Sequence, residues 1–386
     1  MNISGYDLGQ GFVFSRNASP ITISNIESVS ITVTVLFQEA SYVMTLSPDS
    51  SGTVTLDLQG ILRSLAPKIG TMDRIAPYKF TPITTNNRIT ITASGTSDEE
   101  VSADLVAIDG GIDGNPGLDF LENIIWLTWR NEETKTYISG YEQLSMLIAT
   151  YAVPDLVEGQ LFRHKTLAKV YLNTGEDVIV ELSDGMVSQA ADLYLLQVDA
   201  SLRSVADIIH EKYPEYSARD ILAYDVYGEF CKLNDEVIMT DAPMAQRFIV
   251  APARQNFKCF VFRNRLGVPD TVFSTGPFTK ILTPDVDTFI SGRTESELTN
   301  KSKESFRVNT GNLDSILQIN LWQDFFLSDE RFIFEDNQLK KIIIEEGKSE
   351  AKLQTLNNME FTYHLAEQPA GRFRTKSAPN KFSYNE

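Results

Sequence analysis

Histidine is scarce in this sequence of 386 residues, and so are the patterns that build most catalytic centres. The three histidines are His164, His210 and His364, and none stands in an HExxH, nucleophile-elbow or Cys-His context. No GxGxxG or GxxxxGK[ST] loop is present to hold a phosphate. We therefore expect a protein that is not an enzyme, with no catalytic, metal or cofactor residues. We expect His164 to face solvent, His210 to lie near a helix end, and His364 to lie on the polar face of a strand.

Cysteine is almost as rare. Cys231 and Cys259 form no CxxC pattern, which excludes a zinc-ribbon spacing and a disulfide framework. We expect both to be buried free thiols.

Basic residues are outnumbered, since 34 Lys and Arg face 52 Asp and Glu and give a net charge of −18. Such a chain repels a polyphosphate backbone, so we expect no nucleic-acid partner. The exception is the segment 371–386, a flexible basic tail that could order against an acidic neighbour. Its residues Arg372, Arg374 and Lys376 are candidate interface residues.

Long apolar runs are also missing. No run approaches the roughly 20 residues that span a bilayer, so we expect no membrane span. The first part of the chain has one cation, Arg16, and no apolar core, so we expect no secretory signal peptide and synthesis in the cytoplasm.

Alternation of apolar and polar residues is what the chain has in abundance. Val29, Ile31, Val33 and Val35 alternate with Ser and Thr. Val54, Leu56 and Leu58 resume the alternation, which predicts a further strand through Leu58, and similar alternation recurs up to about residue 110. Short strands separated by turns predict a mainly β fold of tandem antiparallel β-sandwich-like domains with a few short helices. The length of the chain favours more than one domain. We expect domains over 1–110, 111–255 and 256–370, the last of them α+β.

Three helices are predicted within this β-rich pattern. Ser139 to Glu142 fits a capping box for a helix that would run on to Tyr151. Ser201 would start a second helix that ends before Pro214. A third would run from Asn312, with Leu313, Leu317, Leu321 and Phe325 on its buried face. Trp322 then lies at the edge of that face, which makes it a candidate interface residue.

Other chemistry remains as alternatives. The Gly- and Asp-rich segment 109–119 predicts a loop, although its oxygen-bearing side chains leave a calcium site open. Glycoside hydrolysis needs only two carboxylates, for which Glu122, Asp285 and Asp287 are conceivable candidates. Trp126 and Trp129 alternate across a strand, so at least one belongs to a core, and exposed aromatics would suit sugar binding.

Three stretches carry a resemblance to a known group of proteins. Residues 262–276 form an aromatic strand, an Asn264-x-x-Gly267 turn, an Asp-Thr pair and a Thr-Gly step. Residues 309–313 lead into the predicted helix, which 327–332 follows, and residues 361–366 form an aromatic strand. Together they resemble the C-terminal unit of β-rich tail or virion structural proteins encoded by phages and prophages of Bacteroidota. This chain departs from that group in having Val268 and Pro269 before the Asp-Thr pair.

The resemblance extends over most of residues 20–370 and rests on turns and core positions. It implies a non-enzymatic structural protein of a phage tail or baseplate-like virion, assembled in the host cytoplasm. Its implied partners are copies of itself, in a ring-like arrangement, and neighbouring tail proteins. One alternative is a carbohydrate-binding adhesin that contacts a glycan on a bacterial surface, and another is a polysaccharide-degrading enzyme.

Overall fold

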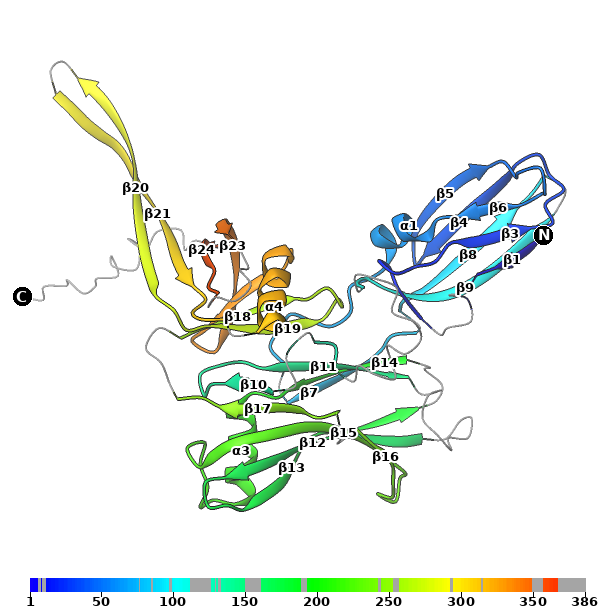
Figure 1. Cartoon of the computed structure of the whole chain (residues 1–386). Coiled ribbons are helices and arrows are strands. Elements are labelled where there is room, and N and C mark those ends of the chain that lie inside the picture. Colours follow the sequence, from blue (N-terminus) through cyan, green and yellow to red (C-terminus); the bar gives the residue numbers. More distant parts are fainter. Residues whose placement is uncertain are drawn as a thin grey trace, which may run out of the picture.

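The computed structural model describes most of the chain. The described residues are 1–5, 8, 12–75, 77–84, 86–96, 99–111, 126–128, 130, 133–149, 161–188, 193–241, 244–252, 257–291, 294–313, 315–348 and 357–366, without the side chains of 149, 188, 284–291, 294–303 and 348. The fold is mainly β, with several antiparallel sheets and a few helices, which confirms the predicted fold class (Figure 1).

The N-terminal unit is a sandwich of two sheets. Ile21, Ile31, Val33 and Ile91 are among the residues that fill the core between them. The five-stranded sheet has the order β2 (Val13–Phe14), β9 (Glu100–Ile108), β8 (Arg88–Ser94), β4 (Ile31–Phe37) and β5 (Ala40–Leu46). The opposing sheet has the order β1 (Asn2–Ser4), β3 (Ile21–Ser24) and β6 (Val54–Leu56).

Two details of this unit differ from the sequence prediction. Val29 lies before β4 and is 89% exposed, because the buried alternation begins only at Ile31. Leu58 does not extend a strand but begins α1 (Leu58–Leu65), whose N-terminus is capped by the Asp57 side chain. The cap accepts a hydrogen bond from the Gln59 amide, which satisfies one of the free donors of the first turn.

The central unit is a second sandwich. Its larger sheet has the order β10 (Glu133–Thr136), β17 (Gln246–Val250), β15 (Ile221–Cys231), β12 (Leu161–Leu172) and β13 (Asp177–Ser188), with β16 (Val237–Thr240) paired to β15. The smaller sheet has the order β11 (Gln143–Ala149), β14 (Leu193–Asp199) and β7 (Tyr78–Pro82). One apolar core contains side chains from both sheets and from α3 (Leu202–Lys212). The predicted helix at Ser201 is confirmed, with Ser201 as its N-cap.

The helix predicted from the capping box at Ser139 is wrong, because the chain forms β11 there. β11 pairs antiparallel with β14, from Gln143 opposite Asp199 to Ala149 opposite Leu193. Every residue from Tyr141 to Ile148 is buried, so both faces of the strand are covered. A strand that is buried on both faces loses the polar alternation that distinguishes it from a helix.

β7 crosses the predicted boundary between the first two domains. Although it lies within residues 1–110, it pairs with β14 of the central unit, with Phe80 opposite Leu196. The chain then returns to the N-terminal unit to form β8 and β9. The two units are thus connected by a shared strand as well as by linkers.

The C-terminal unit is a seven-stranded sheet with one helix on it. The strand order is β19 (Pro269–Ser274), β18 (Lys258–Arg263), β22 (Arg331–Glu335), β23 (Gln338–Lys348), β24 (Glu360–Leu365), β21 (Thr294–Asn309) and β20 (Phe278–Ser291). The helix, α4 (Ile316–Leu327), shares a core with Phe260, Ile333 and Phe361 of the sheet. This helix is confirmed, but it begins later than predicted, with Ser315 as the cap and Leu313 in a β-bridge to Asn357.

The strands β20 and β21 form a long two-stranded ribbon that projects from the body of the molecule (Figure 1). Phe306 of β21 lies opposite Tyr363 of β24, but the pairing with β24 covers only Phe306–Asn309. From there to Thr294 the described ladder of β21 is with β20 alone. We call the part of the ribbon that begins at Thr283 and ends at Lys303 the arm.

Candidate functional site at the joint between the units

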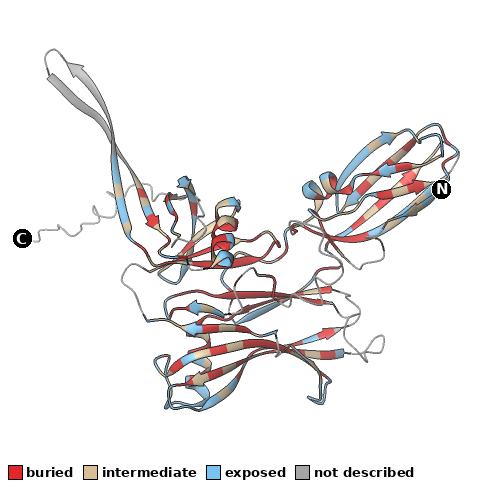
Figure 2. Ribbon diagram, in the orientation of Figure 1, coloured by how far each residue is buried: buried red, intermediate tan, exposed pale blue. Residues whose placement is uncertain are grey.

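The three units meet at an apolar cluster that none of them completes alone. Figure 2 shows buried residues continuing from each unit into the region where they come together. The cluster combines β2 and β9 of the N-terminal unit, β11 and β14 of the central unit, and the turn between β18 and β19 of the C-terminal unit. Its buried members are Phe14, Ile69, Ile83, Val106, Ile108, Leu127, Leu147, Leu193, Leu195, Leu266 and Val268. Burial of this shared surface favours one fixed arrangement of the units.

A buried charge network lies beside this cluster. Arg130 donates through Nε to Asp270 Oδ1 at 2.6 Å and through Nη1 to Glu142. Thr128 donates its hydroxyl proton to Asp270 Oδ2 at 2.7 Å, and Asn264 donates to the same oxygen at 3.2 Å. Arg130, Glu142 and Asp270 all have side chains that are almost wholly buried. The network joins the central unit to the C-terminal unit, since Arg130 and Glu142 belong to the first and Asp270 to the second.

The electrostatics of this network follow from its burial. Burial disfavours the charged guanidinium of Arg130, but Glu142 and Asp270 outweigh it, and the pKa of Arg130 is raised. Burial raises the pKa of Glu142 to about 7, while Arg130 acts in the opposite direction. Removing one partner of such a group leaves the others as uncompensated buried charges. The joint therefore depends on all three side chains together.

The turn after β18 makes close contact with the N-terminal unit. Asn264 accepts hydrogen bonds from the amides of Leu266 at 2.9 Å and Val268 at 3.3 Å, which fixes the turn. Gly267 has a φ of +83°, and a Cβ there would collide with the carbonyl oxygen of Asp109. Gly111 donates its amide proton to the Arg265 carbonyl at 2.7 Å. Glycine is required at 267 both for the backbone conformation and for the close approach.

A second set of ion pairs spans the same joint. Lys68 lies 2.8 Å from Asp329 Oδ2 and 3.2 Å from Glu330 Oε1. Arg263 pairs with Glu330 at 2.8 Å and also donates to the carbonyl oxygens of Ile69 and Gly267, each at 2.6 Å. The linker that follows α1 is thus attached to the C-terminal unit at Lys68 and Ile69.

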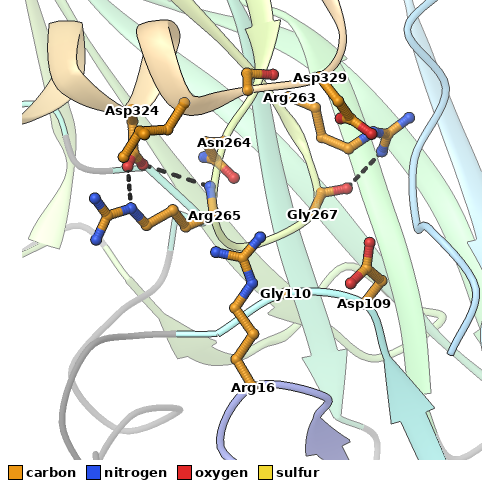
Figure 3. A pocket seen from close by; sticks show the side chains of 11 residues that line it. Arg16, Asp109, Gly110, Arg263, Asn264, Arg265, Gly267, Asp324 and Asp329 are labelled. Carbon is orange, nitrogen blue, oxygen red and sulfur yellow. Dashed lines mark hydrogen bonds and ion pairs between the residues drawn. The ribbon is translucent and has the colours of Figure 1, made fainter. Parts of the chain in front are cut away.

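A pocket of about 560 Å³ opens at this joint (Figure 3). Arg16, Asp109 and Gly110 line one side from the N-terminal unit, and the β18–β19 turn and the end of α4 line the other. Arg265 pairs with Asp324, whose pKa is raised by burial and lowered by Arg265, with burial the larger effect. Guanidinium and carboxylate groups both line the pocket, and Arg263, Arg265, Asp324 and Asp329 are already paired within the protein. This arrangement favours holding the units together over binding a strongly charged ligand.

Of the predicted interface residues, Trp322 is the only one that the structure describes, and its predicted position is wrong. It is 3% exposed and packs between the rings of Phe325, at 5.2 Å, and Phe361, at 5.9 Å. The helix starts at Ile316 and is apolar around most of its circumference, so the buried face includes Trp322 while Leu317 is exposed. Arg372, Arg374 and Lys376 lie outside the described residues, as does the rest of the tail.

His164 is also placed differently from the prediction. It points inward from β12, is fully buried, and packs 4.8 Å from the ring of Phe230. Burial lowers the pKa of His164 to about 3, and neither ring nitrogen has a hydrogen-bond partner in the part of the chain that is described. His210 is exposed at the end of α3, and His364 pairs with Glu345 on the face of β24 opposite Tyr363, as predicted.

The remaining candidates are divided between the core and the undescribed residues. Cys231 and Cys259 are buried free thiols, as predicted. Trp126 is buried in the central core. Within the described residues no group of acidic, histidine or cysteine side chains is arranged to hold a metal ion. No helix in the described part of the chain has the length and apolarity that a bilayer crossing requires. The structure does not describe Glu122, Trp129, residues 112–119 of the predicted loop, where a calcium site was left open, or the side chains of Asp285 and Asp287.

The joint itself was not predicted, although Asn264 and Asp270 belong to the segment 262–276, one of the stretches that carry the resemblance. Its other residues lie elsewhere, since Thr128 and Arg130 flank Trp129 and Glu142 comes from the predicted capping box. One signal was present in the sequence. Asp270 stands among apolar residues on a strand, and a carboxylate in that position needs a buried partner.

Comparisons with known proteins add little to this picture. Neither a family model nor a curated protein matches the chain. Among solved structures, a Salmonella alpha-2-macroglobulin mutant matches at 8% identity over 89% of this chain and 24% of that chain, with a TM-score of 0.18. An elastase-activated Escherichia coli alpha-2-macroglobulin matches at 8% identity over 96% and 31%, with a TM-score of 0.19. A 1.5-MDa bacterial ice-binding adhesin matches at 9% identity over 82% and 93%, with a TM-score of 0.16.

The chain spans 24% and 31% of the length of the two macroglobulins. TM-scores of 0.16 to 0.19 carry no argument about fold or function.

Proposed function

We propose that this chain is a non-enzymatic structural protein that assembles, through protein–protein interfaces, into a phage tail or baseplate-like virion. Copies of the chain and neighbouring tail proteins are the proposed partners. The observation that carries this proposal is the arm. It extends beyond the core of its own unit, and its described ladder consists of β20 and β21 paired with each other (Figure 1).

A ribbon of two strands gains stability when another chain pairs with its edges. A two-stranded hairpin is marginally stable alone in water, and its outer edges present free amide and carbonyl groups to another chain. At about 3.3 Å per residue, the 14 residues of β20 extend for several nanometres. A ribbon of this reach can contact a neighbouring molecule while the body stays at a distance.

The joint supports the same proposal. The shared apolar cluster and the buried charge network fix the three units relative to one another. A component of a symmetric particle must present its contact surfaces at constant angles, because small errors accumulate around a ring. Part of this joint, including Asn264 and Asp270, lies in the segment 262–276, one of the stretches that carry the resemblance to phage structural proteins.

The adhesin alternative finds less support. Trp126 and Trp322, the tryptophans that the structure describes, are both buried and cannot stack on a sugar ring. The exposed tyrosines Tyr42, Tyr78 and Tyr213 lie in separate elements of the first two units. Sugar-binding sites usually gather aromatic rings on one surface.

The test compares the full chain with a variant whose arm is shortened. Residues 284–302 would be replaced by Asn-Gly, which joins Thr283 to Lys303, its partner in the ladder, through a two-residue hairpin turn. The expected result is that the full chain forms rings or tubes in particle images. The shortened variant should form no such particles. It should keep its unfolding midpoint, because the core of the C-terminal unit contains no residue of the arm.

Either of two results would overturn the proposal. The first is a full chain that stays monomeric at high concentration with no ring or tube in the images. The second is a shortened variant that assembles as well as the full chain.

A further inference from the structure

The charge network at the joint has one more carboxylate than it has cations. Arg130, Glu142 and Asp270 have side chains that are at most 1% exposed, and both carboxylates bond to the same guanidinium. With both carboxylates ionised, one positive and two negative charges would leave a net charge of −1 away from water. A buried ionisable group without compensation becomes neutral instead. One of the two carboxylates is therefore expected to hold a proton.

The hydrogen bonds indicate which carboxylate holds this proton. Asp270 accepts from four donors, which are Nε of Arg130, the hydroxyl of Thr128, the side-chain amide of Asn264 and the backbone amide of Thr271. Donors to an ionised carboxylate stabilise its charge. Glu142 accepts from Arg130, but its Oε1 is buried and has no hydrogen-bond partner in the described part of the chain. Glu142 is thus the carboxylate that takes the proton.

The Thr136 hydroxyl provides a site to which a protonated Glu142 can donate. Thr136 is fully buried, its Oγ1 also lacks a hydrogen-bond partner among the described residues, and it lies near enough to affect the charge of Glu142. Protonation would leave a neutral Glu142 beside the balanced pair of Arg130 and Asp270. The pKa of Glu142 agrees with this assignment, because burial raises it to about 7 although Arg130 acts to lower it.

The other titratable groups around Glu142 do not supply a second positive charge. In the described residues they are Arg130, Asp199 of β14, Tyr224 of β15, Cys259 of β18 and Asp270 of β19. Burial raises the pKa of both Tyr224 and Cys259, so these two groups stay neutral. Asp199 accepts a hydrogen bond from the backbone amide of Ser201 at 3.0 Å. Arg130 is the one cation of this set.

Glu142 and Asp270 lie on opposite sides of the contact between two units. Glu142 immediately precedes β11 of the central unit, and Asp270 belongs to β19 of the C-terminal unit, which lies against β11 (Figure 1). Loss of the proton would place two buried negative charges, one from each unit, on the same guanidinium. Entry of water would relieve this charge, because Arg130 Nη2, Glu142 Oε1 and Thr136 Oγ1 would then gain hydrogen-bond partners.

We propose that the joint is a pH-sensitive switch, in which proton uptake by Glu142 holds the central and C-terminal units together and proton release loosens them. In an open joint Glu142 reaches water and regains its ordinary pKa of 4.5, whereas in the closed joint its pKa is about 7. The closed joint therefore binds the proton more tightly, and the stability that it gains is present below pH 4.5 and is lost as the pH rises to about 7.

The ratio of open to closed joints should rise by up to about tenfold for each pH unit in this window. The inference does not rest on the proposed function, because it concerns the units of a single chain.

The experiment measures the distance between the two units in the full chain by double electron–electron resonance. Spin labels would be attached at Glu211→Cys on α3 and Asn320→Cys on α4, which are exposed positions, while the native cysteines are buried. An excess of unlabelled chain restricts the measurement to distances within one molecule. Glu142→Gln mimics the protonated carboxyl at every pH. Glu133→Gln, at an exposed position of β10, is the matched control.

The expected result is a narrow distribution of distances at about pH 6 and a broader one with longer distances at about pH 8.5, both in the otherwise unchanged labelled chain and in Glu133→Gln. Glu142→Gln should keep the narrow distribution at both values. Distances that do not change with pH in the labelled chain would overturn the proposal, and so would a Glu142→Gln variant that broadens in the same way.

Infrared spectroscopy of the wild-type chain adds a test that needs no variant. Carbon-13 in the carboxyl group of glutamate separates the carbonyl band of a protonated Glu side chain from that of Asp, and a buried carboxyl absorbs apart from exposed ones. We expect the band of a buried, protonated glutamate at about pH 6 and its loss by about pH 8.5. Absence of this band at the lower pH would overturn the proposal even if Glu142→Gln failed to fold.

Discussion

Arg130 is the side chain that neutralises two buried carboxylates at the joint. Replacing it with methionine keeps the apolar stem but leaves Glu142 and Asp270 without their counter-charge. We expect Arg130→Met to lower the free energy of unfolding by about 3–5 kcal/mol, measured by denaturant titration.

The control for this variant is Arg88→Met. Arg88 pairs with Asp104 on the surface, where the two side chains are 56% and 50% exposed. Loss of such a pair should cost about 0–1 kcal/mol. Equal effects of the two substitutions would show that the joint does not depend on the charge network.

His164 provides a prediction about pH. Its pKa is about 3 in the folded protein and 6.5 in the unfolded chain, so the unfolded state binds the proton first as the pH falls. The contribution of His164 to stability is present above pH 6.5 and is lost as the pH falls toward 3, by about 1.4 kcal/mol per pH unit. His164→Phe should remove this part of the pH dependence.

Unfolding measured at several pH values would check this expectation. Asp241, whose pKa burial raises to about 6, contributes a slope of opposite sign in both proteins. Parallel pH profiles of the wild-type protein and His164→Phe would contradict the buried, neutral state of His164.

The burial of His164 could have been predicted from the residues around it. Phe162, Thr166, Ala168 and Val170 share its parity along β12 and are all buried. The charges of Arg163 and Lys165 suggested solvent, but on a strand the adjacent residues point to the opposite face. The partners of Arg130 were harder to predict, because Asp270 lies 140 positions away and only the tertiary fold brings it near.

At the scale of elements, the turn between β18 and β19 is constrained by the close approach of Gly267 to Asp109. Gly267 and Gly175 both have positive φ values, +83° and +86°, but a Cβ at Gly175 would meet nothing within 4 Å. Gly175→Ala should therefore cost only the conformational strain, about 1–2 kcal/mol. Gly267→Ala should cost substantially more, because the carbonyl of Asp109 must also move.

Denaturant unfolding measures the loss of stability in each variant. Limited proteolysis between the units measures how far the joint has loosened. We expect Gly267→Ala to be cut faster in the linker near Lys68, and Gly175→Ala to be cut like the wild-type protein. If both variants lost the same stability and resisted protease equally, the contact with Asp109 would not be important for the joint.

Elements with exposed polar faces were predicted well, and those buried on both sides were not. The strands of the N-terminal sheet follow the alternation of Ile31, Val33 and Val35, and α3 follows its Ser201 cap. β11 was predicted as a helix because burial on both faces removed its alternation. α1 was missed because Leu58 continued the strand period of Val54 and Leu56.

At the scale of the whole molecule, a contact between the arm and a different surface of the next copy would be heterologous, and repetition of such a contact closes a ring or continues as a filament. Particle images of the full chain should therefore show rings or tubes that are absent when the arm is shortened.

The domain boundary near residue 110 could not be predicted correctly from composition, because β7 leaves the first unit and pairs with β14 before the chain returns. The alternation of Tyr78 to Pro82 shows a strand but not the sheet to which it belongs. Pairing over long sequence distances depends on which edge is open when the units come together.

The path of β7 also determines how the molecule would respond to tension. A force that pulls the N-terminal unit away must strip β7 from β14 as well as open the apolar joint, because the chain enters the central sheet at Tyr78 and leaves it at Pro82. Detachment would thus require the breaking of a row of hydrogen bonds, which a flexible tether between separate domains does not impose. A particle built from such subunits would transmit a pull on its outer face into the central sheets.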